Sequence, residues 1–230
     1  MGRLAPARAG VRVREAGGGA AAGLLCLSAR VENLSLTGLE IGPETAELAR
    51  ANIALSERAD TRIVMGDIGQ AERPFAPSHR SDHGFANRPW HRDDATASPL
   101  PRRDKARRAI EETFPTWVRS LSRLLKEKGS LTLAIPAERL AETLVACAKN
   151  RIASTDIAPF WPHAGEEARI ILVRGRLGGR AGSRLLPGIV LHKHDGSYSD
   201  AAEAILRKGA PLYPDSFGNP PKISALPHFC

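Results

Sequence analysis

The sequence has few cysteines and lacks long apolar runs, and both features exclude whole classes of protein. Its three cysteines lie far apart, with no C-x-x-C or Cys/His spacing, so we expect neither a disulfide framework nor a metal site. No apolar run approaches the roughly 18 residues of a membrane-spanning helix, and no apolar segment follows the basic start as it would in a secretory signal. We expect a soluble cytoplasmic protein with no metal and no membrane partner. The oligomeric state is open, with a monomer as the default.

Positive charge is what the chain has in excess. Among its 230 residues, 33 are Lys or Arg and 25 are Asp or Glu, so the formal net charge is +8. The hydrophobic fraction of 42% is ordinary for a folded domain. The excess indicates an acidic partner, nucleic acid first, although most surplus arginines on most proteins are simply solvated.

Short β-branched segments alternate with Ala- and Leu-rich segments along the chain. The pattern predicts strands at 11–15, 34–41, 61–65, 82–87, 130–135, 152–157 and 168–175, and helices at 20–31, 44–55, 110–128 and 137–149. Gly129 is the predicted stop of the helix at 110–128. Strands that alternate with helices form a parallel sheet, and ligands of such sheets bind at the carboxyl ends of the strands.

The chain divides into one main domain and a shorter ending. We expect residues 1–180 to form the α/β domain and residues 181–210 to pack on it as an appendage, with a turn at Asp195–Gly196. Residues 211–230 are rich in proline and predict an extended tail. The polar segment 88–105 predicts a long loop.

Two acidic motifs point to a cofactor that contains a nucleoside. The segment Glu15–Gly19 joins the first strand to the first helix, where glycines let the backbone approach a ligand. Glu40 closes the second strand about 20 residues further on, where a carboxylate can accept both hydroxyls of a ribose. Asp67 ends the third strand and can accept from an adenine amino group. The simpler interpretation of the glycines is tight strand–helix packing. The simpler interpretation of Glu40 and Asp67 is capping of a helix or loop. NAD and S-adenosylmethionine both fit.

The segment Asn87-Arg88-Pro89-Trp90 follows the fourth strand and favours one of these cofactors. An Asn oxygen and the next backbone carbonyl can both accept from an exocyclic amine, and an aromatic ring can stack on the base. Such positioning suits amine methylation, because it holds the nitrogen lone pair toward an electrophile without a separate catalytic base.

The segments EAGGGAAAG, LTGLEI, VMGDI and ANRPWH, in this order, resemble class I S-adenosylmethionine-dependent methyltransferases with an (N/D)PP(Y/F/W) motif. The resemblance is greatest to the bacterial tRNA(Val) adenine-N6 methyltransferase-like family and includes the ending LLPGIVLHKHDGSYSDAAEAIL. It implies a Rossmann-like α/β fold with a mostly parallel seven-stranded sheet, helices on both faces and a short C-terminal appendage. It also implies S-adenosylmethionine as cofactor and tRNA or another structured RNA as partner.

The same resemblance assigns roles to individual residues. The implied cofactor-binding residues are Glu15, Gly17, Gly19, Glu40, Asp67 and Asn87. The implied catalytic residues, which hold the target amine, are Asn87, Arg88, Pro89 and Trp90. Arg88 stands where the family has its first proline, and only about ten residues precede the first strand, fewer than in family members.

We therefore expect an N-methyltransferase that acts on an exocyclic amine, most of all adenine N6 in tRNA. The two departures leave a catalytically impaired RNA-binding relative open as an alternative. A methyltransferase for a protein or small-molecule amine is another alternative on the same fold. An NAD-dependent oxidoreductase would leave Asn87, Pro89 and Trp90 without a role.

A basic run lies shortly after the amine motif. Its positive residues are Arg102, Arg103, Lys105, Arg107 and Arg108. The run is either the solvated start of a helix or a patch that contacts RNA phosphates, and the second interpretation predicts RNA binding that weakens steeply with salt.

Overall fold

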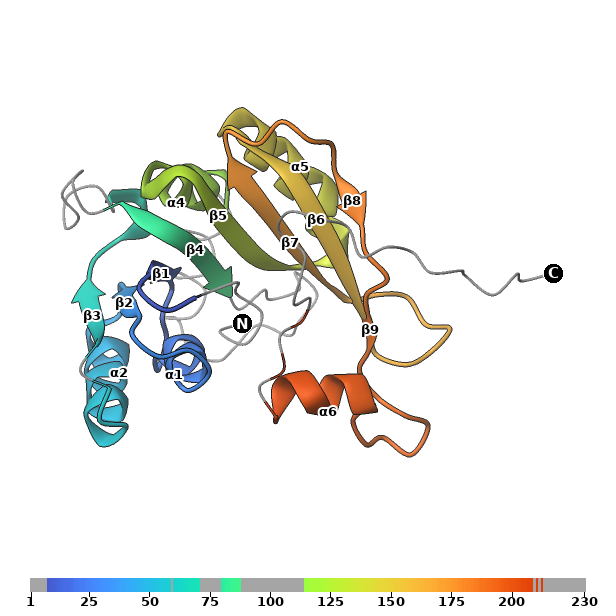
Figure 1. Ribbon diagram of the computed structural model, residues 1–230, viewed down its shortest axis with the longest axis horizontal. Helices are drawn as coiled ribbons and strands as arrows, with labels where there is room; N and C mark the ends of the chain where they lie inside the picture. Colours follow the sequence, from blue (N-terminus) through green and yellow to red (C-terminus); the bar gives the residue numbers. More distant parts are fainter. Residues whose placement is uncertain are drawn as a thin grey trace, which may run out of the picture.

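The computed structural model describes residues 8–58, 60–70, 80–87, 114–208, 210 and 212, and these build one open sheet with helices on both faces (Figure 1). The strands are β1 (Arg12–Ala16), β2 (Ser35–Glu40), β3 (Thr61–Met65), β4 (Ser81–Asn87), β5 (Leu125–Pro136), β6 (Ile152–Trp161), β7 (Ile170–Leu177), β8 (Arg184–Leu185) and β9 (Ile189–Val190). The helices are α1 (Ala22–Ser28), α2 (Pro43–Leu55), α4 (Phe114–Arg123), α5 (Leu140–Lys149) and α6 (Asp200–Leu206), with 3-10 turns η1 (Ile68–Gln70) and η3 (Ala137–Arg139).

The sheet has the strand order β3-β2-β1-β4-β5-β7-β6-β8, and β9 also pairs with β6. Strands β3, β2, β1, β4 and β5 are parallel, whereas β7 runs antiparallel to both β5 and β6. The predicted mostly parallel Rossmann-like fold is confirmed, with β8 and β9 as short additions at one edge. The chain turns from one half of the sheet to the other between β1 and β4, so the crevice beside these two strands is where a ligand is expected.

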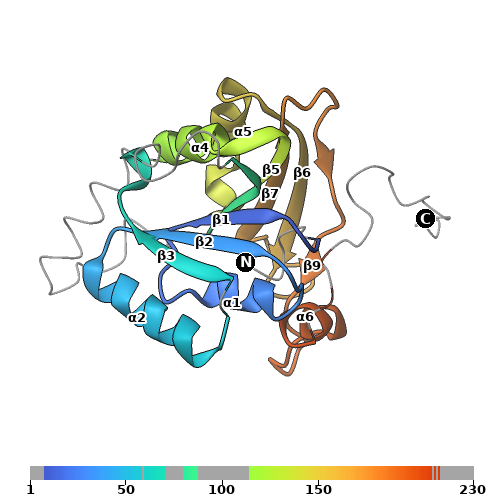
Figure 2. The same ribbon diagram turned by 60° about the vertical axis from the view of Figure 1, so that its left-hand side comes forward.

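Helices cover the sheet on both faces, with α4 and α5 on one and α1 and α2 on the other (Figure 2). One core cluster lies under α4 and α5, with Val118, Leu121 and Cys147 packed on Leu131 and Leu133. A second cluster lies under α1 and α2 on the opposite face. Because parallel strands are buried from both sides, they contain nearly continuous apolar residues, as the sequence does.

The ending after β7 packs on the outer half of the sheet. Ala202 and Ile205 of α6 join Ile189 of β9 in a third cluster that includes Phe160 and Leu172 of the sheet. Ser199 caps α6, and its hydroxyl oxygen accepts from the N–H of Ala202 at 3.1 Å. The expected strand, turn and short helix are present, and the division into a domain, an appendage and a tail stays a prediction.

The predicted helix over 110–128 with a stop at Gly129 is wrong at its end. Helix α4 ends at Arg123, and β5 begins at Leu125 and includes Gly129. A Cβ atom on Gly129 would lie 2.8 Å from the carbonyl oxygen of Lys126 and 3.1 Å from that of Asp82. Gly129 therefore lets β4 and β5 approach where their register shifts, and the helical spacing of the leucines continues by chance into the strand.

No helix in the described ranges is long and apolar enough to cross a membrane.

Candidate cofactor and substrate site

The structure brings the sequence-predicted residues on β1, β2, β3 and β4 to one edge of the sheet. Glu15 lies on β1, Glu40 is the last residue of β2, Asp67 follows β3, and Asn87 is the last residue of β4. Ala16 of β1 pairs with Leu39 of β2 on one side and with Ala86 of β4 on the other. The residues thus surround the carboxyl ends of neighbouring parallel strands.

The glycine turn after β1 is held tightly against β2. The N–H groups of Gly17 and Gly18 both donate to the carbonyl oxygen of Leu39, at 2.9 and 3.1 Å. Gly17 and Gly19 have φ values of 66° and 52°, which glycine adopts without strain. A Cβ atom on Gly17 would lie only 2.9 Å from the ring of Trp117 in α4, so the turn needs glycine there for two reasons.

Glu40 joins this turn to the start of α2. Its Oε2 accepts from the N–H of Gly19 and its Oε1 from the N–H of Gly42, both at 2.9 Å. These bonds fix the carboxylate at the edge of the sheet. Each carboxylate oxygen has a second lone pair, so the group can also accept from two vicinal hydroxyls of a ligand.

Glu15 is buried, with only 4% of its surface exposed. Its carboxyl group lies against α1, where a Cβ atom on Gly23 would come within 2.3 Å of Oε1. Burial raises the pKa of Glu15 to about 8, with nearby Glu40 acting in the same direction, while the backbone N–H of Leu24 acts against them. The carboxyl group therefore stays largely protonated near neutral pH.

Asp67 is exposed and begins the turn η1, where its Oδ1 accepts from the N–H of Gly69 at 2.8 Å. This is the capping role that the sequence left open as the simpler interpretation, and contact with adenine stays a prediction.

Two apolar residues at the same edge were not predicted from the sequence. Ile41 follows β2 and is 68% exposed, and Met65 at the end of β3 is 51% exposed. Met65 pairs with Glu40 across β2 and β3. Ile41 follows Glu40 in the chain, and Asp67 lies two residues after Met65. Exposed apolar side chains beside two carboxylates suit a planar base attached to a ribose. Each is the last residue of a predicted strand, at 34–41 and 61–65, and an apolar residue in that position was the signal in the sequence.

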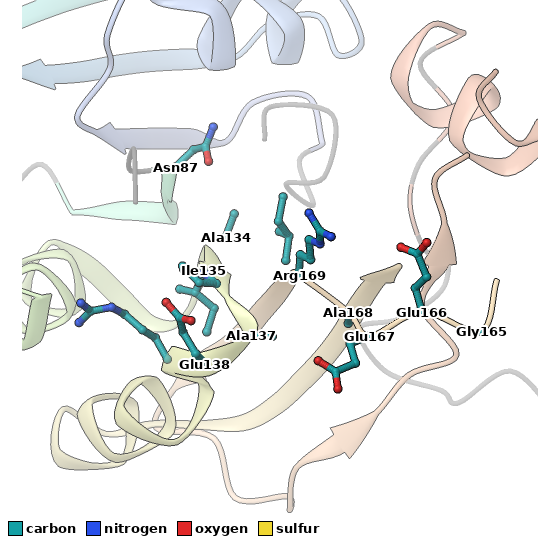
Figure 3. Close-up of a pocket in the computed structure, with 13 residues that line it drawn as sticks. Asn87, Ala134, Ile135, Ala137, Glu138, Gly165, Glu166, Glu167, Ala168 and Arg169 are labelled. Atoms are coloured by element: carbon teal, nitrogen blue, oxygen red, sulfur yellow. The ribbon is translucent and has the colours of Figure 1, made fainter. Parts of the chain in front are cut away.

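Asn87 opens onto a cavity of about 1240 Å³ between the ends of β4 and β5 and the β6–β7 connection (Figure 3). The charged residues of its lining are Glu138, Arg139, Glu166, Glu167 and Arg169. Arg88, Pro89 and Trp90 lie outside the described residues, as do Arg102, Arg103, Lys105, Arg107 and Arg108. Of the predicted amine-holding residues, the structure therefore describes Asn87.

One observation that does not depend on the sequence motifs indicates that the residues at this edge fit S-adenosylmethionine. The Oε2 atom of Glu15 is buried and has no hydrogen-bond partner in the part of the chain that the structure describes. A buried acceptor without a partner is costly, and an N–H or cationic group of a ligand would satisfy it. Glu40 can accept from the ribose hydroxyls, and Glu15 can accept from the amino acid portion. The glycine turn therefore has one acceptor for each of these two parts of S-adenosylmethionine. No cluster of metal-ligating side chains occurs in the described ranges.

Comparison with known proteins gives the class. No family model matches the chain. Two curated proteins from strains of Porphyromonas gingivalis, both named tRNA1(Val) (adenine(37)-N6)-methyltransferase, are 29% and 28% identical to it over 199 residues, which are 84% of this chain and 76% of each relative.

Solved structures agree on the fold. A predicted O-methyltransferase from Agrobacterium tumefaciens superposes with a TM-score of 0.75 at 22% identity, over 92% of this chain and 95% of that one. A precorrin-6y C5,15-methyltransferase from Geobacter metallireducens GS-15 superposes with a TM-score of 0.51 at 12% identity, over 74% and 82% of the two chains.

The chain therefore has the fold of the class I S-adenosylmethionine-dependent methyltransferases. Within that class it is similar to the tRNA1(Val) adenine-N6 methyltransferases, which agrees with the resemblance that the motifs imply.

Proposed function

We propose that the protein transfers the methyl group of S-adenosylmethionine to the N6 atom of an adenine in tRNA. The observation that carries the proposal is the position of Asn87. It ends β4, directly beside the strand that carries the glycine turn, and it opens onto a cavity large enough for a nucleoside. The names of the two curated relatives support adenine N6 as the acceptor.

The cofactor, when bound, supplies an electrophilic methyl carbon on a positively charged sulfur. The protein residues position the two partners. Glu40 binds the ribose hydroxyls, Gly17 and Gly19 provide the backbone surface for the cofactor, and Asp67 accepts from its adenine. The unpaired oxygen of Glu15 accepts from the amino acid portion. These assignments place the methyl group near the switch between β1 and β4.

Asn87 is proposed to orient the target amine. Its amide oxygen and the Arg88 carbonyl accept the two amine protons, so the nitrogen lone pair faces the methyl carbon, and Trp90 stacks on the base. With the cofactor bound, the N–C bond would form as the methyl–sulfur bond breaks, which would leave a neutral thioether, and one amine proton would pass to solvent. An adenine amine is a weak nucleophile, so orientation supplies most of the rate enhancement.

The net charge of +8 supports RNA as the substrate. The basic residues Arg102, Arg103, Lys105, Arg107 and Arg108 are proposed to contact phosphates, and a tRNA substrate would place the protein in the cytoplasm. A second candidate, an amine on a protein or small molecule, is favoured by the three glutamates of the cavity, Glu138, Glu166 and Glu167, against two arginines.

The test is methyl transfer from isotopically labelled S-adenosylmethionine into unmodified tRNA transcripts, followed by nucleoside digestion. We expect the label in N6-methyladenosine, with a loss of at least about tenfold in kcat for Asn87→Ala, because an unoriented amine forfeits much of the positional advantage. Label in another nucleoside, or only in protein or small-molecule amines, would contradict the proposal. Saturable tRNA binding without any transfer would indicate the impaired relative instead.

A further inference from the structure

Three aromatic rings form a row beside the candidate cavity. The rings of His192 and Tyr198 stack with centroids 5.1 Å apart and an interplanar angle of 22°, and the ring of His163 lies 5.8 Å from that of His192. The guanidinium carbon of Arg207 lies 5.8 Å from the centre of the Tyr198 ring. His192 and Arg207 both lie over the ring of Tyr198, whereas the side chain of His163 is 40% exposed. The row, which we call the ring row (His163, His192 and Tyr198), is therefore open to solvent at its His163 end.

The backbone of the appendage holds the ring row against the β6–β7 connection. The N–H of His192 donates to the carbonyl oxygen of Pro162 at 2.9 Å, and His192 also bridges to Tyr198 across a tight turn. The Nδ1 atom of His163 lies 3.2 Å from Oε1 of Glu166. Because Glu166 also lines the cavity beside Asn87, the ring row and the cavity share one surface.

Arg169 lies on that surface, next to the start of β7. Its carbonyl oxygen accepts from the N–H of Ala137 at 3.0 Å, which fixes its backbone beside the end of β5. Its side chain is exposed and makes no ion pair with any described residue. Figure 3 shows the guanidinium group projecting between Asn87 and Glu166, while Glu167 turns to the other side.

We propose that the RNA segment next to the target adenine lies along this surface, with a phosphate on Arg169 and an unpaired base stacked on the ring row. The inference rests on the proposed function and adds to it how the RNA is held. A guanidinium fork matches phosphate oxygens, and aromatic rings on an exposed surface stack on bases of any sequence.

The phosphate contact predicts a change in salt dependence. Binding of a fluorescently labelled tRNA transcript is measured by anisotropy at several salt concentrations, with Arg169→Ala compared against Arg151→Ala. Arg151 is exposed, pairs with Glu127 and precedes β6 at the opposite edge of the sheet. We expect Arg169→Ala to weaken binding several-fold and to lower the slope of log affinity against log salt by about one, with Arg151→Ala unchanged. Equal slopes for Arg169→Ala and wild type would overturn the proposal.

The stacking contact predicts an optical signal. A tRNA anticodon-arm RNA with 2-aminopurine beside the target adenine is expected to lose fluorescence on binding to wild type and to His163→Phe. His163→Ala should abolish the change and weaken binding about tenfold. A purely structural role for His163 would lower the thermal midpoint while binding and fluorescence stay as in wild type, and that result would overturn the proposal.

Both readouts measure binding, so they are separate from the proposed reaction. If transfer fails but both variants weaken binding as expected, the surface stands and the proposed reaction does not. If transfer to tRNA succeeds but the variants bind like wild type, only the surface is wrong. A wild-type chain that binds no RNA overturns both.

Discussion

Protonation of Glu15, a residue of the cofactor site, makes the stability of the protein depend on pH. Its buried carboxyl group has a pKa of about 8 against an ordinary 4.5. In the unfolded chain the group releases its proton near pH 4.5, whereas the folded chain keeps it until about pH 8. The unfolded state therefore binds fewer protons between these values, so the free energy of unfolding falls as pH rises through this window.

The fall of the free energy of unfolding with rising pH gives a prediction for Glu15→Gln. The amide has nearly the same shape and no charge, so the variant should lose the downward trend between pH 4.5 and pH 8 and be more stable than wild type above pH 8. Urea unfolding at several pH values measures the effect, with the exposed Glu32→Gln as control. Because buried His83, with its pKa lowered to about 4, contributes stability that rises with pH in part of this window, the difference between Glu15→Gln and wild type is what isolates Glu15. A difference that stays constant from pH 4.5 to pH 8 would contradict the burial argument.

At the scale of residues, the motif positions could be predicted but their contacts could not. The spacing of Glu15 and Glu40 indicated one edge of a sheet, and both lie there. That Glu40 would bind the N–H groups of Gly19 and Gly42 depends on a turn that folds back over β2. Ile41 and Met65 were missed because apolar residues in strands ordinarily indicate a core.

The glycine turn has two positions with positive φ, and these positions differ in one contact. Gly17 and Gly19 both have positive φ, but only Gly17 faces a neighbour, the ring of Trp117. Alanine at position 19 should therefore cost about 1 kcal/mol from backbone strain, and alanine at position 17 should cost more. Thermal unfolding compares the two variants, and Gly17→Ala combined with Trp117→Leu should recover part of the difference. Equal costs for the two single variants would show that Trp117 does not constrain the turn.

A buried ion cluster joins three strands at the outer half of the sheet. Asp156 on β6 lies 3.2 Å from Arg174 on β7 and 2.7 Å from Arg184 on β8, and Asp156 and Arg174 are buried. Asp156→Asn should lower the free energy of unfolding by about 3 kcal/mol, because it leaves buried guanidinium charge without its carboxylate. The exposed Asp195→Asn is the control for the urea titration. A loss no greater than that of the control would mean that solvent screens the cluster.

At the scale of elements, periodicity predicted the strands and most helices, and it was wrong where two elements join without a turn signal. Leu121, Leu124 and Leu125 continue one apolar pattern, yet α4 ends at Arg123 and β5 begins at Leu125. The leucines are buried in both elements, so burial alone does not distinguish them. Pairing of β5 with β4 decides the boundary, and it is a long-range contact.

At the scale of the whole molecule, the sheet order places the cofactor edge and the cavity side by side. Glu15 and Glu40 lie on one side of the switch between β1 and β4, and Asn87 and the cavity lie on the other. The alternation of strands and helices predicted this arrangement, because it requires a parallel sheet. The antiparallel placement of β7 between β5 and β6 has no local signal, although it positions the β6–β7 connection that carries Arg169.

The most direct test of the account is calorimetric titration of the protein with S-adenosylmethionine. We predict saturable binding by wild type and by Glu47→Gln, whose carboxylate pairs with Arg50 on the outside of α2. For Glu40→Gln we predict affinity reduced at least about tenfold, because a charge-assisted contact to the ribose is lost. A far-ultraviolet spectrum like that of wild type would show that Glu40→Gln is folded. Absence of binding by wild type, or equal affinity for Glu40→Gln and wild type, would contradict the assignment of this edge as the cofactor site.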